Sequence, residues 1–124
     1  MTMNPIEIAE AFSRHQFAIT FDSFAPNIEW RNLGGAHHIG KDAVIEACEQ
    51  SSNYLNTVRT AFTRFRTMVA TDCVVTDAQA DYLDDNKNST VASCDIYDFV
   101  DGRLTTITSY TVEIGTDPLA QPAD

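Results

Sequence analysis

The sequence predicts a single α+β domain in which helices cover one face of a curved antiparallel sheet. Apolar residues recur at helical spacing up to about Leu55, whereas β-branched and aromatic residues alternate with polar ones from Thr57 onward. The chain has 124 residues, the length of one domain, and 44% of them are apolar, which is enough to build a core. Helices followed by a series of long strands are typical of the α+β class.

Two helical stretches are expected before the first strand. Asn4 and Pro5 form an N-cap and first-turn pair, and apolar residues then recur at helical spacing through Phe12. Residues 17–24 carry aromatic side chains along one side of a second, shorter stretch, which ends at Pro26 because the residue before a proline avoids helical backbone angles. Together these stretches predict an N-terminal helical cap.

A short strand, a loop and a third helix are expected next. Residues 28–32 have the composition of a strand. Residues 33–40 are predicted as a loop, since two adjacent glycines free the backbone there. Lys41 and Asp42 then open a helix that continues to about Tyr54.

Four long antiparallel strands are predicted in the second half of the chain, separated by turn signals. They are placed near residues 61–71, 73–82, 89–100 and 103–114. The pair Asp101-Gly102 is the strongest hairpin signal. Residues 1–115 are expected to form one domain, and residues 116–124, with two prolines and few apolar residues, are expected to be a flexible C-terminal tail.

Charge and cysteine content exclude several classes of function. Eight basic residues stand against eighteen acidic ones, so a net charge of −10 repels nucleic acid and anionic membranes. Cys48, Cys73 and Cys94 are odd in number and lack zinc-site spacing, so they are predicted to be thiols in a reducing compartment. The sequence begins with no signal-peptide pattern and contains no apolar run of membrane-spanning length, so a cytoplasmic protein is expected.

Three motifs carry a resemblance that covers nearly the whole chain. Residues 24–30 read Phe-Ala-Pro-Asn-Ile-Glu-Trp, residues 39–44 read Ile-Gly-Lys-Asp-Ala-Val, and residues 95–104 read Asp-Ile-Tyr-Asp-Phe-Val-Asp-Gly-Arg-Leu. In this order and spacing they resemble the SnoaL-like branch of the nuclear transport factor 2-like superfamily. The resemblance implies the cystatin-like fold, a cone-shaped antiparallel sheet wrapped around N-terminal helices, with a hydrophobic pocket inside the cone.

The resemblance also implies a homodimer. Ala92, Cys94 and Ile96 alternate with the residues expected to face the cavity, so they form an apolar outer face of the sheet. Burial of this face against a second copy would avoid an exposed apolar patch. The expected partners are therefore a small apolar molecule and a second copy of the chain, with no nucleic acid and no membrane.

Members of this superfamily differ widely in activity, so their catalytic residues are compared one by one. Aligned with ketosteroid isomerases, Asp95 takes the place of the protonated Asp of the oxyanion hole, but the base position falls on Arg31 or Trp30 and the first helix offers no Tyr. Aligned with limonene epoxide hydrolases, Asn32 matches a water-binding Asn, but the catalytic Asp falls on Ser109. Neither reaction is expected to run with the family's own machinery.

Asp95 is the leading catalytic candidate. An apolar cavity disfavours the charged carboxylate, so Asp95 would remain protonated and donate a hydrogen bond to a developing oxyanion. Two structural alternatives stay open, a turn-facing carboxylate and a salt bridge, for which Arg31 is the available partner. A salt bridge would lower the pKa of Asp95 and remove its role as a proton donor.

The candidate base is one of two adjacent histidines in the glycine-rich loop. His37 and His38 could lean over the pocket mouth and titrate near neutrality. His38 is preferred because it lies nearer to the start of the third helix, and which of the two faces the pocket stays open. The candidate ligand-binding residues are Trp30, Asn32, His37, Tyr54, Tyr82, Ser93, Tyr97, Ile107 and Ser109.

Two functions of different class follow. The first is a small enzyme of the isomerase, cyclase or dehydratase type, acting without a cofactor on a small apolar carbonyl-containing compound, with Asp95 as acid and His38 as base. The alternative is a non-catalytic domain that binds a small hydrophobic molecule in the same pocket. No metal site is predicted, since three ligands would have to converge. Convergence of two titratable groups on one ligand would favour the enzyme.

Overall fold

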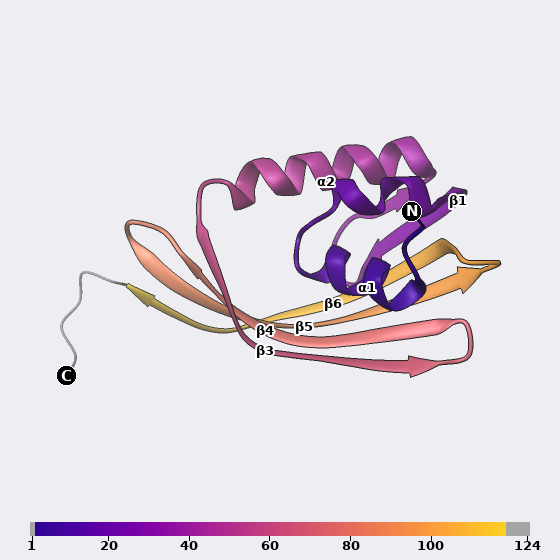
Figure 1. Ribbon diagram of the computed structural model, residues 1–124. Helices are drawn as coiled ribbons and strands as arrows, with labels where there is room; N and C mark the ends of the chain where they lie inside the picture. Colours follow the sequence, from indigo (N-terminus) through magenta and orange to yellow (C-terminus); the bar gives the residue numbers. More distant parts are fainter. Residues whose placement is uncertain (1, 119–124) are drawn as a thin grey trace.

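The computed structural model describes residues 2–118, and its helices lie on one face of a six-stranded sheet (Figure 1). In chain order the elements are α1 (Pro5–Ser13), the 3-10 helix η1 (Ala18–Ser23), β1 (Phe24–Asn32), β2 (His37–Ile39), α2 (Lys41–Leu55), β3 (Arg59–Ala70), β4 (Cys73–Leu83), β5 (Lys87–Val100) and β6 (Arg103–Pro118). Among residues 2–118, no helix is both long and apolar enough to cross a membrane. The predicted α+β class is confirmed.

The strands lie in the order β2, β1, β6, β5, β4, β3. Every neighbouring pair is antiparallel except β1 and β6, which run parallel, so the sheet is mixed and not antiparallel throughout as predicted. The physical reason is the connection: β1 and β6 come from opposite ends of the chain, so no hairpin turn forces them to run in opposite directions.

Helix α1 begins where its sequence signals predict. The Oδ1 atom of Asn4 accepts a hydrogen bond from the backbone N–H of Glu7 at 2.8 Å, and the Asn4 N–H donates to Oε1 of Glu7 at 2.9 Å. This reciprocal capping box satisfies two of the otherwise unpaired donors at the start of the helix. It fixes the end of α1 that lies farthest from the cavity described below.

Side chains of α1, α2 and the concave face of the sheet form the core. Phe12 lies at its centre, with its ring centroid 4.8 Å from that of Phe17, 5.1 Å from Trp30 and 5.9 Å from Tyr97. The other buried members of this cluster are Ile8, Ala9, Phe24, Ile28, Val44, Ala47, Cys48, Val74, Phe99, Leu104 and Ile107. The cluster anchors the helices over one end of the sheet.

Three elements differ from the sequence-based expectation. Strand β1 begins at Phe24 and includes Pro26, which is tolerated because pairing with β6 is irregular between Phe24 and Glu29. His37–Ile39, predicted as part of a loop, form the edge strand β2 and pair with β1. Strand β6 continues to Pro118, three residues into the segment expected as a tail, and residues 119–124 lie outside the described residues.

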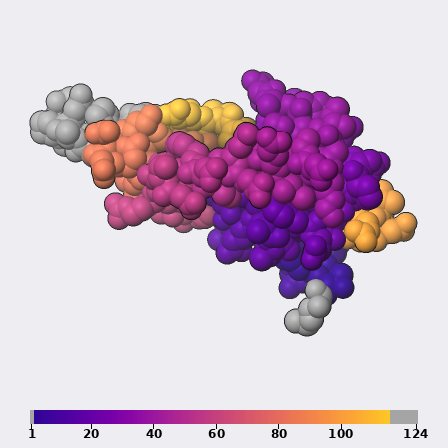
Figure 2. All heavy atoms as spheres, turned by 90° about the horizontal axis from the view of Figure 1, so that it is seen from above, coloured from indigo at the N-terminus to yellow at the C-terminus, as the bar shows by residue number. Residues whose placement is uncertain are grey.

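The long strands extend beyond the helices. Seen from above, the turn between β4 and β5 and the last part of β6 project past α2 (Figure 2). The helices therefore cover one part of the concave face, α2 over β1 and β2 and α1 over β4, whereas the distal parts of the long strands extend beyond them. This arrangement leaves a space between the underside of the helices and the sheet.

Candidate active site

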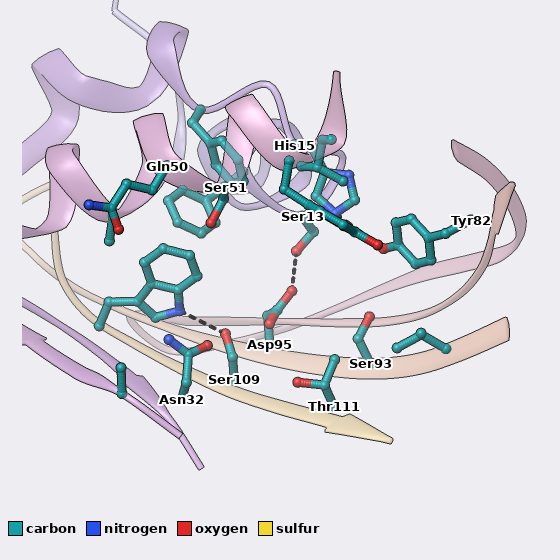
Figure 3. Close-up of a pocket in the computed structure, with 18 of the residues that line it drawn as sticks. Ser13, His15, Asn32, Gln50, Ser51, Tyr82, Ser93, Asp95, Ser109 and Thr111 are labelled. Atoms are coloured by element: carbon teal, nitrogen blue, oxygen red, sulfur yellow. Dashed lines mark hydrogen bonds between the residues drawn. The ribbon is translucent and has the colours of Figure 1, made fainter. Parts of the chain in front are cut away.

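A cavity of about 740 Å³ lies between the helices and the concave face of the sheet. Its size falls in the range of roughly 300–1,000 Å³ that is usual for small-molecule sites. Apolar and aromatic side chains form much of its wall, among them Phe12, Phe17, Trp30, Ala47 and Leu55. Its polar and titratable lining residues include Ser13, His15, Asn32, Gln50, Ser51, Tyr82, Ser93, Asp95, Ser109 and Thr111 (Figure 3). His38, Tyr54, Lys87, Ser89 and Glu113 also line it.

A row of polar residues runs from strand to strand across the concave face, and three of its four members, Asn32, Ser109 and Asp95, line the cavity. Asn32 of β1 pairs in register with Ser109 of β6, Ser109 pairs with Asp95 of β5, and Asp95 pairs with Thr76 of β4. Residues directly opposite one another on neighbouring strands present their side chains on the same face. The sheet therefore brings one carboxylate and three neutral polar groups together under the helices.

Asp95 is held by a hydroxyl cluster centred on Ser13, the last residue of α1. Ser13 Oγ donates to Asp95 Oδ2 at 2.8 Å, and it lies 2.5 Å from Tyr97 Oη and 2.6 Å from Thr76 Oγ1. A hydroxyl has one proton and two acceptor lone pairs. The Tyr97 hydroxyl also donates directly to Asp95 Oδ2, at 3.4 Å, so two hydroxyl protons point toward the carboxyl group.

Burial raises the pKa of Asp95 above its usual value, and hydrogen bonds from neighbouring hydroxyl groups oppose this rise without cancelling it. Among residues 2–118, no ion pair involves Asp95. Arg31, the partner considered from the sequence, is exposed and pairs in register with His37 on the outer face of the sheet. Asp95 therefore faces the cavity without a neutralising cation, and the salt-bridge alternative is wrong.

Trp30 forms the wall beside this row. Its Nε1–H donates to Ser109 Oγ at 3.0 Å, which fixes the indole over the sheet. Ser109 occupies the position where the comparison with epoxide hydrolases expects a catalytic Asp, and here it accepts a hydrogen bond from an indole. The water-activating set of that enzyme is therefore incomplete in this cavity.

The two predicted histidines point in opposite directions, because successive residues of a strand alternate between its faces. His38 pairs with Trp30 and lines the cavity, with its ring centroid 5.9 Å from that of Trp30. His37 lies on the outer face, with Nε2 3.4 Å from Glu29 Oε2. The structure thus places His38 at the edge of the cavity and places His37 outside it.

The remaining predicted residues divide into two groups. Tyr54, Tyr82 and Ser93 line the cavity, as do Trp30, Asn32 and Ser109. Tyr97 and Ile107 do not: both side chains are fully buried in the core, so their expected place on the cavity wall is wrong. The period of two places them on the correct face, but α1 covers that part of the sheet, and Phe12 packs against the Tyr97 ring.

His15 lines the cavity and was not predicted from the sequence. It follows the end of α1, where its N–H bonds to Phe12 O at 3.0 Å and the Gln16 N–H bonds to Ala11 O at 2.9 Å. These two bonds form a Schellman motif, which places His15 in the left-handed region at φ 68°. The only sequence signal for His15 is its place just beyond the predicted helix, since a loop residue carries no periodicity.

Burial lowers the pKa of His15 below its usual value of 6.5, so the imidazole is neutral at neutral pH. Its Nε2 atom lies 3.4 Å from Tyr82 Oη. Burial also raises the pKa of Tyr82, so the phenol keeps its proton. In residues 2–118, no group of three His, Cys, Asp or Glu side chains is arranged to hold a metal ion.

The backbone at His15 predicts an unusual order of stability among variants. A left-handed backbone costs a residue with a Cβ atom roughly 1–2 kcal/mol, whereas glycine adopts it freely. His15→Gly and His15→Ala both remove the imidazole, so we expect His15→Gly to be more stable by about 1 kcal/mol. Urea unfolding of the two variants measures this difference. Equal stability, or a more stable alanine variant, would contradict a left-handed backbone at this position.

The sequence itself identifies the family to which this site belongs. The family model of the SnoaL-like domain matches residues 7–107, most of the chain. The chain belongs to the SnoaL-like domain family. This membership confirms the resemblance drawn from the three motifs, and it places the cavity of this SnoaL-like domain in a superfamily that uses one fold for several activities.

Solved structures of similar fold include a nuclear transport factor 2-like protein of unknown function from Cytophaga hutchinsonii, 28% identical, with a TM-score of 0.78 over 86% of this chain and 95% of that one. A candidate polyketide cyclase from Xanthomonas campestris is 16% identical, with a TM-score of 0.64 over 83% of each chain. An LEH-like epoxide hydrolase from M. tuberculosis is 17% identical, with a TM-score of 0.63 over 86% and 81%. A search of the curated proteins found no match.

Proposed function

We propose that this SnoaL-like domain is a cofactor-independent enzyme that moves protons on a small apolar carbonyl compound, as an isomerase, cyclase or dehydratase. The observation that carries the proposal is Asp95, a carboxyl group with a raised pKa and no cationic partner, at the floor of a largely apolar cavity. A buried carboxyl group that faces an open cavity is characteristic of functional sites. Structural neighbours described as an epoxide hydrolase and a candidate polyketide cyclase add support, since they act on small molecules within this fold.

The chemistry follows from the protonated form of Asp95. A carboxylic acid donates a hydrogen bond to a carbonyl oxygen and stabilises the negative charge that develops there when a proton leaves the neighbouring carbon. Ser13 can then donate its proton to the carboxylate that remains, as it does in the structure. The cavity wall supplies apolar contacts, and Trp30 offers a flat surface beside Asp95.

Two probes test the proposal. β-Tetralone is an apolar ketone whose carbonyl-adjacent hydrogens exchange with deuterium when the enol forms, and β-naphthol has the shape of that enol. We expect β-naphthol to bind in the cavity, and we expect wild-type protein to accelerate deuterium exchange into β-tetralone, followed by NMR. Binding without exchange would favour the non-catalytic domain that holds a small hydrophobic molecule. Neither binding nor exchange would reject the proposal.

We also propose that the outer face of the sheet binds a second copy of the chain. Thr111 and Glu113 line the cavity, so Tyr110 and Val112 point outward from β6, next to Cys94 and Ala92 of β5. Tyr110 and Val112 are about half exposed in a single chain. The part of this face formed by Ala92, Cys94, Tyr110 and Val112 carries no charged side chain, which suits a two-fold contact, because a chain of net charge −10 repels its copy elsewhere.

Light scattering after gel filtration is expected to give twice the 13.7 kDa of one chain. Val112→Glu would bury a charge in the contact, so the dissociation constant should rise about 30-fold or more. Val100 is a matched control, since it is 59% exposed against 60% for Val112 but lies at the β5–β6 turn. A monomeric wild type, or equal effects of Val112→Glu and Val100→Glu, would refute this contact.

A further inference from the structure

We infer that His15 is the general base of this cavity and removes the proton from the carbon next to the carbonyl group that Asp95 holds. This inference rests on the proposed function and replaces His38, the base expected from the sequence. It assigns the acid and the base of one reaction to two side chains that the end of α1 brings together. Figure 3 shows His15 and Asp95 in the same cavity, on the helix side and the sheet side respectively.

The placement of His15 relative to Asp95 is set by Ser13. Ser13 Oγ lies 2.8 Å from Asp95 Oδ2, so the last residue of α1 is tied to the carboxyl group. His15 follows two residues later, and two residues of chain span at most about 7 Å. The Schellman motif fixes the backbone between them. The same short segment therefore positions the carboxyl group and the imidazole.

The surroundings of His15 suit a base. Its ring centroid lies 5.9 Å from Phe17, 5.6 Å from Phe62 and 6.0 Å from Tyr82, so the imidazole is enclosed by aromatic side chains. The 3.4 Å separation between Nε2 and Tyr82 Oη is at the long end of hydrogen-bond distances. Nε2 can therefore exchange this weak contact for one with a substrate that enters the cavity.

Charged and titratable groups from each neighbouring element bear on the protonation of His15. Asp95 and Lys87 face the cavity from β5, Glu113 from β6, Tyr82 from β4 and Tyr54 from α2. Arg14, the cap residue between Ser13 and His15, stacks over Phe65, with its guanidinium carbon 3.9 Å from that ring centroid and 5.7 Å from the ring centroid of Phe62. No carboxylate forms an ion pair with His15 among residues 2–118, so burial dominates and favours the neutral imidazole.

His38 is less well placed than His15. Strands β2, β1, β6 and β5 are successive neighbours, so three spacings of roughly 4.8 Å separate β2 from β5 by about 14 Å. The residue of β5 in register with His38 is Tyr97, so Asp95 is also displaced by two residues along the strand. Trp30 lies between them, in contact with the His38 ring on one side and hydrogen-bonded to Ser109 on the other. An acid and a base that act together must both reach neighbouring atoms of one substrate within about 3.5 Å.

The proposed step balances without a further reactant. The His15 imidazole accepts a proton from the carbon next to the carbonyl group as that C–H bond breaks. The electron pair forms a C=C bond, the carbonyl π electrons move to oxygen, and the oxygen takes the proton of Asp95. Return of a proton from the imidazolium to the same or another carbon, and of the enol proton to Asp95, gives exchange or isomerisation and restores both groups.

Alkylation with phenacyl bromide tests which imidazole faces the reacting carbon. A neutral imidazole nitrogen attacks the carbon next to the carbonyl group, the C–Br bond breaks, bromide leaves, and the extra ring proton passes to water. His15, His37 and His38 are the three histidines of the chain, and His37 outside the cavity reports unselective alkylation. We expect His15 to be alkylated about tenfold faster than His37, with β-naphthol protecting His15 only.

Deuterium exchange into β-tetralone separates this inference from the proposed function. His15→Asn keeps a side chain that tolerates a left-handed backbone but cannot accept the proton, so exchange should fall about 100-fold, whereas His37→Asn should leave it unchanged. Burial lowers the pKa of His15 below 6.5, so wild-type exchange should persist at pH 6.5 and decline only at lower pH, where His15 becomes protonated. Preferred alkylation of His38, no selectivity over His37, or full exchange by His15→Asn would overturn the assignment and leave the proposed function standing. No exchange by wild type would reject the proposed function itself.

Discussion

Asp95→Asn is expected to lower deuterium exchange into β-tetralone by a factor of about 100 to 10,000, the usual contribution of a positioned acid. The amide has nearly the shape of the carboxyl group and can still accept a hydrogen bond from Ser13, so the fold is expected to persist. What it lacks is a proton that can move to a developing oxyanion. NMR of β-tetralone in D₂O with wild-type and variant protein measures the ratio of rates.

The same substitution is expected to stabilise the fold at neutral pH. The pKa of Asp95 is higher in the folded than in the unfolded chain, so the folded state binds protons that the unfolded state has lost. The free energy of unfolding of the wild type therefore falls as pH rises from the pKa of Asp95 in the unfolded chain through its pKa in the folded chain. Asp95→Asn removes this loss. The difference in the free energy of unfolding between variant and wild type should therefore be largest at pH 7 and smaller toward acid pH.

Asp98→Asn is the matched control for both measurements. Asp98 lies on the same strand but on the opposite face, where it pairs in register with Cys73 and Thr106 and does not line the cavity. It should change the exchange rate by less than about twofold and should lack the pH-dependent gain, since surface substitutions have small effects. If Asp95→Asn retained full exchange, Asp95 would not be the acid. If it were destabilising at pH 7, the carboxyl group would be stabilising the fold.

Phe12→Ala is expected to lower the free energy of unfolding by about 3–5 kcal/mol. The Phe12 side chain is 3% exposed and contacts the rings of Phe17, Trp30 and Tyr97. Its removal leaves a void that the surrounding aromatic rings can close only in part. Domains of this size have total stabilities of about 5–15 kcal/mol, so the loss is a large share of the total. Urea unfolding followed by Trp30 fluorescence measures it.

Ile19→Ala supplies the comparison for Phe12→Ala. Ile19 is apolar but 58% exposed, so its truncation should change stability by no more than about 0.5 kcal/mol. A loss below about 1 kcal/mol for Phe12→Ala would show that the helices pack loosely on the sheet. Phe12 also lines the cavity, so the variant should in addition bind β-naphthol with altered affinity.

The elements predicted best from the sequence are those with a clear periodicity or a local signal. The capping pair Asn4-Pro5 gave the start of α1, and the turn at Asp101-Gly102 gave the hairpin between β5 and β6. The resemblance placed Asp95 in the cavity through alignment of the Asp-Gly-Arg hairpin, and the period of two along β5 then placed Ser93 on the same face. The capping pair, the turn and the period depend on neighbours within a few residues, which a single sequence contains.

The features that were missed depend on contacts between distant segments. His37–Ile39 form a strand because they pair with the edge of β1. The segment contains no run of β-branched residues that would predict a strand from the sequence. His15 lies in the cavity because the Schellman motif turns the chain after α1. Tyr97 leaves the cavity wall because Phe12 covers it. Packing of this kind is not encoded in local spacing.

The parallel pairing of β1 with β6 also governs the order in which the protein can fold. β1 (Phe24–Asn32) pairs with the nearby strand β2 on one side, but its partner on the other side is β6 (Arg103–Pro118), so closing this contact requires a loop that spans most of the chain. Contacts of such high sequence separation slow folding, because the entropy of loop closure is lost before the contact forms. During synthesis the polar row of Asn32, Ser109 and Asp95 cannot assemble until β6 has left the ribosome. The floor of the cavity is therefore completed only late in the synthesis of this domain.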